Sequence, residues 1–266
     1  MKRAMKQLAA VLSVGALSVG IAHAQPIDFW DYTNEAGFAA FAPAAQVTPS
    51  GDSGDILNLP TTLNWGPNNN SSLVAGSPVS GTIQTNGAPQ PGVALTHNNF
   101  PIALGVSLDT ATLASVLTLT PSGGGPTIEL PTLLFDILFI ETENFPAGGN
   151  CLGGGMAGSG ENTNGCQDIF VLANPEILDT DITFNFDGFE YEVIVTPTGL
   201  EFLTDEACAA VGEGPGCLGF LTPENTQSIF TTFFSIRVEV AIPEPHVLGL
   251  LGIALTGLGL TRRRRR

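Results

Sequence analysis

Hydrophobic and polar residues alternate with a period of two along several stretches of the chain. The clearest stretch is 182–195, ITFNFDGFEYEVIV, in which Asp187-Gly188 is a favoured pair for a two-residue type I′ turn. Polar residues occupy the positions between the aromatic and aliphatic ones, so we predict a hairpin with one buried and one wet face. The turn sets three cross-strand pairs on the buried face: Phe186–Phe189, Phe184–Tyr191 and Ile182–Val193.

Four further segments have strand character. FTTFFSIRVEV at 230–240 alternates, and LLFDILFIE at 133–141 is nearly continuous, which is typical of a central strand; 112–121 and 168–174 complete the set. Asp136 is expected to be a partnered carboxylate at the core edge. No segment predicts a long amphipathic helix. The predicted fold class is therefore all-β, a single antiparallel, jelly-roll-like β-sandwich over residues 25–242.

The N-terminus predicts export. Lys2, Arg3 and Lys6 precede an apolar stretch that ends in Ala22-His23-Ala24, the pattern of a secretory signal peptide over 1–24. Such a peptide implies passage through the Sec translocon. An N-terminal membrane anchor is the alternative, but the apolar run is shorter than the roughly 20 residues of a spanning helix.

The C-terminus has three consecutive elements. Pro243, Glu244 and Pro245 come first, Val247–Thr261 forms an apolar run that we predict to be a transmembrane helix, and the chain ends in a basic cluster of Arg262, Arg263, Arg264, Arg265 and Arg266. Basic residues stay on the cytoplasmic side of a membrane, so the cluster would stop transfer. A permanent tail anchor is the alternative to a temporary one.

This ordered tail, residues 243–266, resembles the PEP-CTERM sorting signal, although many members have a small residue where this chain has His246. The resemblance implies processing by exosortase, a membrane-embedded cysteine transpeptidase of Gram-negative bacteria that make exopolysaccharide. It also implies transient anchoring in the inner membrane and a final place on the cell surface or in the extracellular matrix.

Charge is distributed unevenly along the chain. Arg237 is the single basic residue between 25 and 242, against 24 acidic residues, which gives this segment a formal charge of −23. Such a surface repels nucleic acid, so no nucleic-acid partner is expected. It is typical of a soluble extracellular protein, and it would also suit divalent cations.

The four cysteines form two pairs by position. Cys151 and Cys166 bracket one glycine-rich loop, and Cys208 and Cys217 bracket another. Four cysteines allow three connectivities, of which we favour this local one. A zinc site is the alternative, although the chain has no C-x-x-C spacing and few histidines.

A second resemblance centres on the only histidine between 25 and 242. Thr96, His97, Asn98, Asn99, Phe100, Pro101 and Ile102 match the motif of the THxN family of PEP-CTERM proteins, and 63–73 and 220–240 also resemble that family and related choice-of-anchor domains. The family has no established activity, so the resemblance implies no catalytic residues.

Two roles are open for this motif. It is expected to be a polar plug that fixes a loop between strands, with His97 bridging them through both ring nitrogens. The alternative is a sugar-binding patch made of His97 and Asn99 beside Phe100 or Trp65.

Catalytic signals are weak. GDSGD at 51–55 superficially resembles a serine-protease loop but is interpreted as a turn. No cofactor is predicted. A calcium site is the possibility left open, with Asp52, Asp55 or the Asn68-Asn69-Asn70 loop as ligands but without EF-hand spacing. We therefore predict a non-enzymatic structural or adhesive matrix protein. A calcium-assisted carbohydrate-binding module and a secreted hydrolase are the two alternatives.

Overall fold

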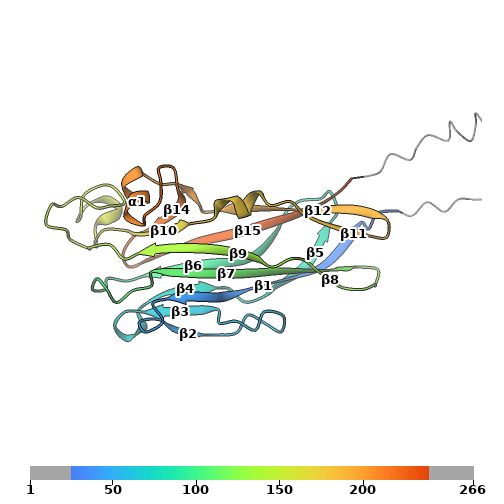
Figure 1. Cartoon of the computed structure of the whole chain (residues 1–266), viewed down its shortest axis with the longest axis horizontal. Helices are drawn as coiled ribbons and strands as arrows, with labels where there is room; N and C mark the ends of the chain where they lie inside the picture. The colour runs from blue at the N-terminus through green and yellow to red at the C-terminus, as the bar shows by residue number, and fades with distance from the viewer. Residues whose placement is uncertain (1–24, 240–266) are drawn as a thin grey trace, which may run out of the picture.

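A computed structural model describes residues 25–239 of the chain, which fold into two packed antiparallel sheets (Figure 1). The predicted signal peptide and sorting tail lie outside the described residues. No helix among residues 25–239 is long and apolar enough to cross a membrane. The two packed sheets confirm the predicted all-β class and the β-sandwich.

The eight-stranded sheet has the order β13-β14-β10-β9-β7-β1-β5, with β8 pairing β7. Its strands are β1 (Phe29–Ala42), β5 (Val79–Gln84), β7 (Thr110–Pro121), β8 (Ile128–Glu129), β9 (Leu133–Ile140), β10 (Asp168–Leu172), β13 (Glu201–Phe202) and β14 (Leu218–Thr222). A six-residue helix, α1 (Asp205–Ala210), lies between β13 and β14. The 3-10 helices are η1 (Pro67–Asn69), η2 (Gly160–Asn162) and η3 (Pro175–Asp179).

The seven-stranded sheet has the order β11-β12-β15-β6-β4-β3-β2. Its strands are β2 (Thr48–Ser50), β3 (Thr62–Trp65), β4 (Ser71–Ala75), β6 (Gln90–Asn99), β11 (Ile182–Phe186), β12 (Phe189–Thr198) and β15 (Thr226–Glu239). The two sheets meet at one side, where the backbone N–H of Asn86 donates to the carbonyl of Ile236 at 2.7 Å.

The predicted hairpin is confirmed, including its register. Strands β11 and β12 pair Phe184 with Tyr191, and the turn residues Asp187 and Gly188 have φ angles of 50° and 82°. Both angles are left-handed, as a type I′ turn requires. The aromatic face packs on Trp30, whose ring meets Phe184 and Tyr191 edge to face.

The other predicted strands are also present. Strand β9 is interior to its sheet, and β15 buries Phe234, Ile236 and Val238 while Arg237 is exposed. Asp136 is partnered as expected, because the Thr112 hydroxyl donates to it at 2.8 Å. It lies on the exposed face of β9, however, and not at the core edge.

The space between the sheets holds two apolar clusters. One surrounds Trp30 and Tyr191 near the β11–β12 hairpin, and the other surrounds Trp65, Phe139 and Phe170 toward the opposite end. A third, smaller cluster packs α1 against the outer face of β10. Strand β10 is therefore buried on both faces, which accounts for its nearly continuous apolar sequence.

The two ends of the sandwich differ (Figure 1). The start of β1 and the end of β15 lie at the hairpin end, where the N–H of Ile27 donates to the Tyr191 hydroxyl and Tyr191 pairs with Val238. The other end carries α1, β10, β14 and the long loop that follows β9. We call it the disulfide end, because both cystines are there.

Candidate functional site

The THNN segment ends strand β6 at the disulfide end. Successive residues of a strand point to opposite faces, so His97 and Asn99 are both turned into the sandwich. Asn98 is turned outward and donates from Nδ2 to the Ser72 hydroxyl at 3.0 Å. The spacing of histidine and asparagine in the motif thus follows from strand geometry.

His97 is completely buried and joins the two sheets. Its Nδ1 lies 2.9 Å from Oγ1 of Thr222, which belongs to β14 of the other sheet. The ring stacks on Trp65 and meets Phe139 edge to face, with centroids 5.7 and 5.1 Å apart. Burial lowers the pKa of His97 to about 3, so the ring is neutral at physiological pH.

Asn99 reinforces the same junction. Its Nδ2 donates to the main-chain carbonyl of Thr222 at 2.9 Å, and the residue is fully buried. The expectation of a polar plug therefore fits the geometry. One detail was wrong: only Nδ1 of His97 is bonded, and its Nε2 has no hydrogen-bond partner.

The sugar-binding alternative needs these side chains at the surface. His97, Asn99 and Trp65 each have 0 % of their surface exposed, so no aromatic platform is formed beside the histidine. Phe100 alone is exposed, at 42 %. The hydroxyl of Ser71 contacts both the N–H and the carbonyl of Phe100 and fixes the end of β6.

Three carboxylates gather next to this junction. Glu141 follows β9, Asp168 begins β10 and Glu224 lies in the turn between β14 and β15. Their candidate ligand oxygens lie within 4.8 Å of one another, and the side chains are 5 %, 1 % and 1 % exposed. We call these residues the acidic triad; antiparallel pairing brings them together, because β9 and β14 end where β10 begins.

The triad has an unusual electrostatic environment. Burial, followed by the negative charge of Asp168, raises the pKa of Glu141. Burial also raises the pKa of Asp168, although the Thr142 N–H that donates to its Oδ1 at 2.9 Å opposes the shift. Burial and the charge of Asp168 raise the pKa of Glu224 to about 8.

No basic side chain balances the triad within residues 25–239. Arg237 is the single lysine or arginine there, and it lies near the far end of β15. Thirteen residues separate it from Glu224, roughly 40 Å along an extended chain. Buried carboxylates are normally paired with a basic side chain or hold a metal. The triad therefore needs a partner other than lysine or arginine.

Two amide side chains lie beside the triad. Asn99 is bonded through its nitrogen to Thr222, the cross-strand partner of Asp168, and its Oδ1 is buried without a partner. Asn144 approaches from the loop after β9, and its Oδ1 is likewise unpartnered. A Cβ on Gly165 would clash with that oxygen and lie 3.0 Å from Cγ of Glu224, so the glycine allows the two groups to face each other.

The disulfide end is closed by the predicted cystines. Cys151–Cys166 and Cys208–Cys217 are both formed, with Cα atoms 5.3 and 5.7 Å apart, and residues 25–239 hold no free cysteine. The local connectivity is confirmed, and the zinc alternative is excluded because every sulfur is bonded. The loop closed by the first cystine contains Gly165, and the N–H of Cys166 donates to the carbonyl of Asn144 at 3.0 Å.

The residues that the sequence suggested as calcium ligands, Asp52, Asp55 and 68–70, do not belong to the acidic triad. Oδ1 of Asp52 accepts from the N–H of Gly54 at 3.0 Å, and Oγ of Ser53 accepts from the N–H of Leu59 at 2.9 Å. GDSGD is thus a loop held by its own side chains. Asn68 and Asn69 adopt left-handed φ angles around η1. Among residues 25–239, the one group of three metal-ligating side chains is the acidic triad.

Sequence reasoning missed the triad and Thr222. Each acidic residue lies next to a strand-like segment, as in LLFDILFIE, DIFVLAN and FLTPEN, but 24 acidic residues offer many such positions. The available signal was weak: in each case a single acidic residue lies beside an apolar strand segment. Only the strand order shows which three converge.

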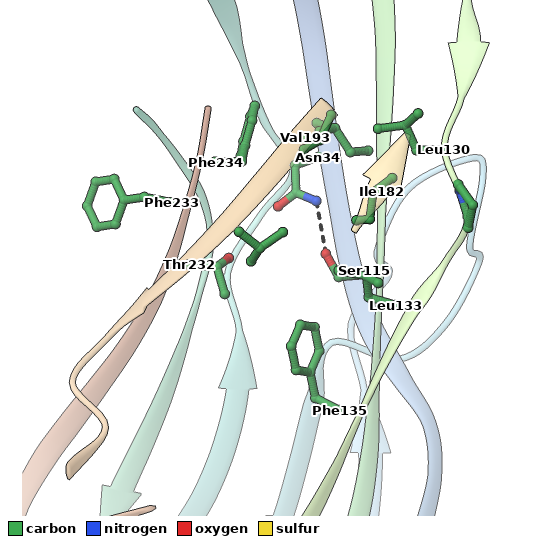
Figure 2. Close-up of a pocket in the computed structure, with 13 residues that line it drawn as sticks. Asn34, Ser115, Leu130, Leu133, Phe135, Ile182, Val193, Thr232, Phe233 and Phe234 are labelled. Carbon is green, nitrogen blue, oxygen red and sulfur yellow. Dashed lines mark hydrogen bonds between the residues drawn. The ribbon is translucent and has the colours of Figure 1, made fainter. Parts of the chain in front are cut away.

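The hydrolase alternative predicted a deep pocket with two converging carboxylates. Figure 2 shows a cavity between the sheets, of about 30 Å³, lined mostly by apolar side chains such as Phe135, Val193 and Phe234. Its polar lining residues are Asn34, Ser115 and Thr232, and Nδ2 of Asn34 donates to the Ser115 hydroxyl at 3.0 Å. A space of this size holds about one water molecule, and no carboxylate lines it.

No family model matches the chain, and no curated protein matches it.

Proposed function

We propose that this chain is an exported protein of a Gram-negative envelope, sorted by exosortase and serving a structural or adhesive role among exopolysaccharide. The observation that carries the proposal is the order of elements at the C-terminus. Pro243-Glu244-Pro245, an apolar run and five arginines follow one another, and a signal peptide stands at the other end. This arrangement leaves the domain outside the cytoplasm while the tail is held in the membrane.

The two cystines support export. Disulfides form and persist in oxidising compartments and are rare in the bacterial cytosol. Both cystines close glycine-rich loops that contribute little apolar packing. Such loops gain from covalent closure, so the domain is suited to a compartment in which its thiols are oxidised.

The position of β15 supports an outward orientation of the disulfide end. Three residues separate Glu239, the end of β15, from Pro243. The hairpin end would therefore face the membrane before processing. The disulfide end, roughly 45 Å away at the start of the 14-residue strand, would point outward.

A non-enzymatic role is supported by the burial of the polar groups. His97 and the three carboxylates of the acidic triad are titratable side chains that lie close together inside the sandwich. Each of them is at most 5 % exposed. Catalytic carboxylates must contact their substrate. The carboxylates of the triad could do so only if the two sheets separated.

Cell fractionation tests the proposal. Replacing Pro243, Glu244 and Pro245 with alanine should retain the protein in the inner membrane, whereas the wild type leaves it. The matched control replaces Glu213, Gly214 and Pro215, a surface triplet of similar composition near Cys217. If the Pro243-Glu244-Pro245 variant is released as the wild type is, the sorting proposal is wrong.

A further inference from the structure

The acidic triad belongs to a larger set of buried oxygens at the disulfide end. Within residues 25–239, seven buried side-chain oxygens lack a hydrogen-bond partner, and all seven come from five residues. The five are Asn99, Glu141, Asn144, Asp168 and Glu224. Buried polar atoms are nearly always bonded, so an accumulation of unpartnered acceptors at one place points to a missing donor or cation.

Asn99 gives evidence independent of the carboxylates. Its nitrogen is held by the carbonyl of Thr222, which pairs with Asp168, and its backbone pairs with Thr226, two residues after Glu224. The amide is thus held by β14 and β15, the two strands that flank the turn with Glu224. The residue is 0 % exposed, and no donor of the protein bonds its Oδ1.

The donor chemistry identifies the class of ligand. Carboxylate and amide oxygens are hard ligands that suit calcium and magnesium, and the set contains no thiolate or imidazole. Three carboxylates without a basic neighbour also favour a divalent cation, since the charge of such an ion would offset most of theirs. From these residues we propose that Glu141, Asp168 and Glu224, with Oδ1 of Asn99 and Asn144, bind one calcium ion.

The number of oxygen donors favours calcium over magnesium. The triad oxygens lie within 4.8 Å of one another, which either ion could bridge. Seven available oxygens match the six to eight ligands that calcium takes, which exceeds the octahedral shell of magnesium.

The site would connect segments that are far apart in sequence. Its ligands come from the end of β6, the loop after β9, the start of β10 and the β14–β15 turn, which together belong to both sheets. The Cys151–Cys166 loop returns beside Asn144, because Gly165 precedes Cys166 and the Cys166 N–H donates to the Asn144 carbonyl. Calcium would therefore order the disulfide end and hold the two sheets together there. This inference does not depend on the proposed sorting, because it concerns the folded domain alone.

Thermal unfolding of the purified full-length protein, produced with its signal peptide so that the cystines form, tests the site. After removal of metal with a chelator, saturating calcium should raise the Tm by about 5–10 °C, the shift expected at 100-fold excess over Kd for a domain of this size. Isothermal titration calorimetry should give one calcium ion per chain.

Isosteric variants separate binding from folding. Glu224→Gln and Asp168→Asn remove a charge but keep the shape, so without metal they should melt at the wild-type temperature or above. Both should lose the calcium-induced rise. Glu143→Gln, an exposed neighbour of Glu141, changes the net charge equally and should keep the full rise.

Three outcomes would overturn the proposal. They are a wild-type Tm unchanged by 10 mM calcium, a rise retained in both Glu224→Gln and Asp168→Asn, and an equal rise with magnesium at the same concentration. Failure of this test with normal sorting would leave the proposed function untouched. Normal calcium binding in a chain that is not sorted would contradict the proposed function and leave the calcium site untouched.

Discussion

His97 and Thr222 tie the two sheets together across 125 residues of sequence, through a 2.9 Å contact between Nδ1 and Oγ1. Asn99 contacts the carbonyl of the same threonine, so two side chains of one strand converge on one residue of the opposite sheet. The junction lies next to the acidic triad, which makes it both a cross-sheet link and one wall of the proposed calcium site.

Replacing His97 with alanine should destabilise the domain. The change removes the partner of Thr222 and leaves a void beside Trp65 and Phe139. An unpaired buried group costs about 1–3 kcal/mol, and the void adds to that cost. We expect the Tm to fall by about 5–10 °C in differential scanning calorimetry. Thr96→Ala, on the outer face of the same strand, is the control, and an unchanged melting curve for His97→Ala would contradict the cross-sheet role.

Stability should depend on pH in metal-free buffer. The pKa of Glu224 is raised from 4.5 to about 8 in the folded protein, so the folded state holds a proton that the unfolded state releases. This contribution is fully present below about pH 4.5 and is lost as the pH rises through about 8. Between pH 6.5 and 8.5 we therefore expect the Tm to fall as the pH rises, with Glu141 and Asp168 acting in the same direction.

The chosen pH window isolates the triad from His97. The folded-state pKa of His97 is lowered to about 3, so its contribution is lost only as the pH falls below 6.5. Glu224→Gln should flatten the slope between pH 6.5 and 8.5, and saturating calcium should flatten it in the wild type. A Tm that rises with pH across this window would show that the triad is not protonated in the metal-free fold.

Gly165→Ala should weaken the disulfide end. The φ angle of 136° is strained for any other residue, and the new methyl group would press on Asn144 and Glu224. Gly154→Ala is a matched control, because its φ angle of 99° is also left-handed but no atom lies within 4 Å of the added carbon. We expect a larger fall in Tm and weaker calcium binding for the 165 variant, measured by calorimetry. Equal effects of the two changes would mean that backbone strain alone, and not pressure on Asn144 and Glu224, causes the loss of stability and of calcium binding.

Removing the first cystine should loosen the loop that it closes. Cys151 and Cys166 are 15 residues apart, and closing a loop of that length contributes about 3 kcal/mol in the chain-entropy model. The double change Cys151→Ser, Cys166→Ser should lower the Tm and expose the loop to proteases. Peptide mapping without reductant checks the connectivity itself, and a fragment joining Cys166 to Cys208 would contradict it.

The sequence alone determined the local features of this protein. The Asp187-Gly188 turn and the aromatic pattern around it fixed the hairpin and its register, since both depend on neighbours a few residues apart. The positions of the cysteines likewise indicated their pairing. Strand β1 was missed, because the polar run Thr33-Asn34-Glu35 interrupts its apolar pattern. In the structure Asn34 and Glu35 are buried and bonded to distant main-chain groups.

Only the tertiary structure decided where the polar motif and the acids meet. The THNN motif was visible in the sequence, but its partner Thr222 was not, because a cross-sheet contact depends on how the two sheets are stacked. Glu141, Asp168 and Glu224 are ordinary acids among 24 in residues 25–242. The antiparallel order of β9, β10 and β14 places them at one buried point, far from the single arginine, and that placement gives them their chemistry.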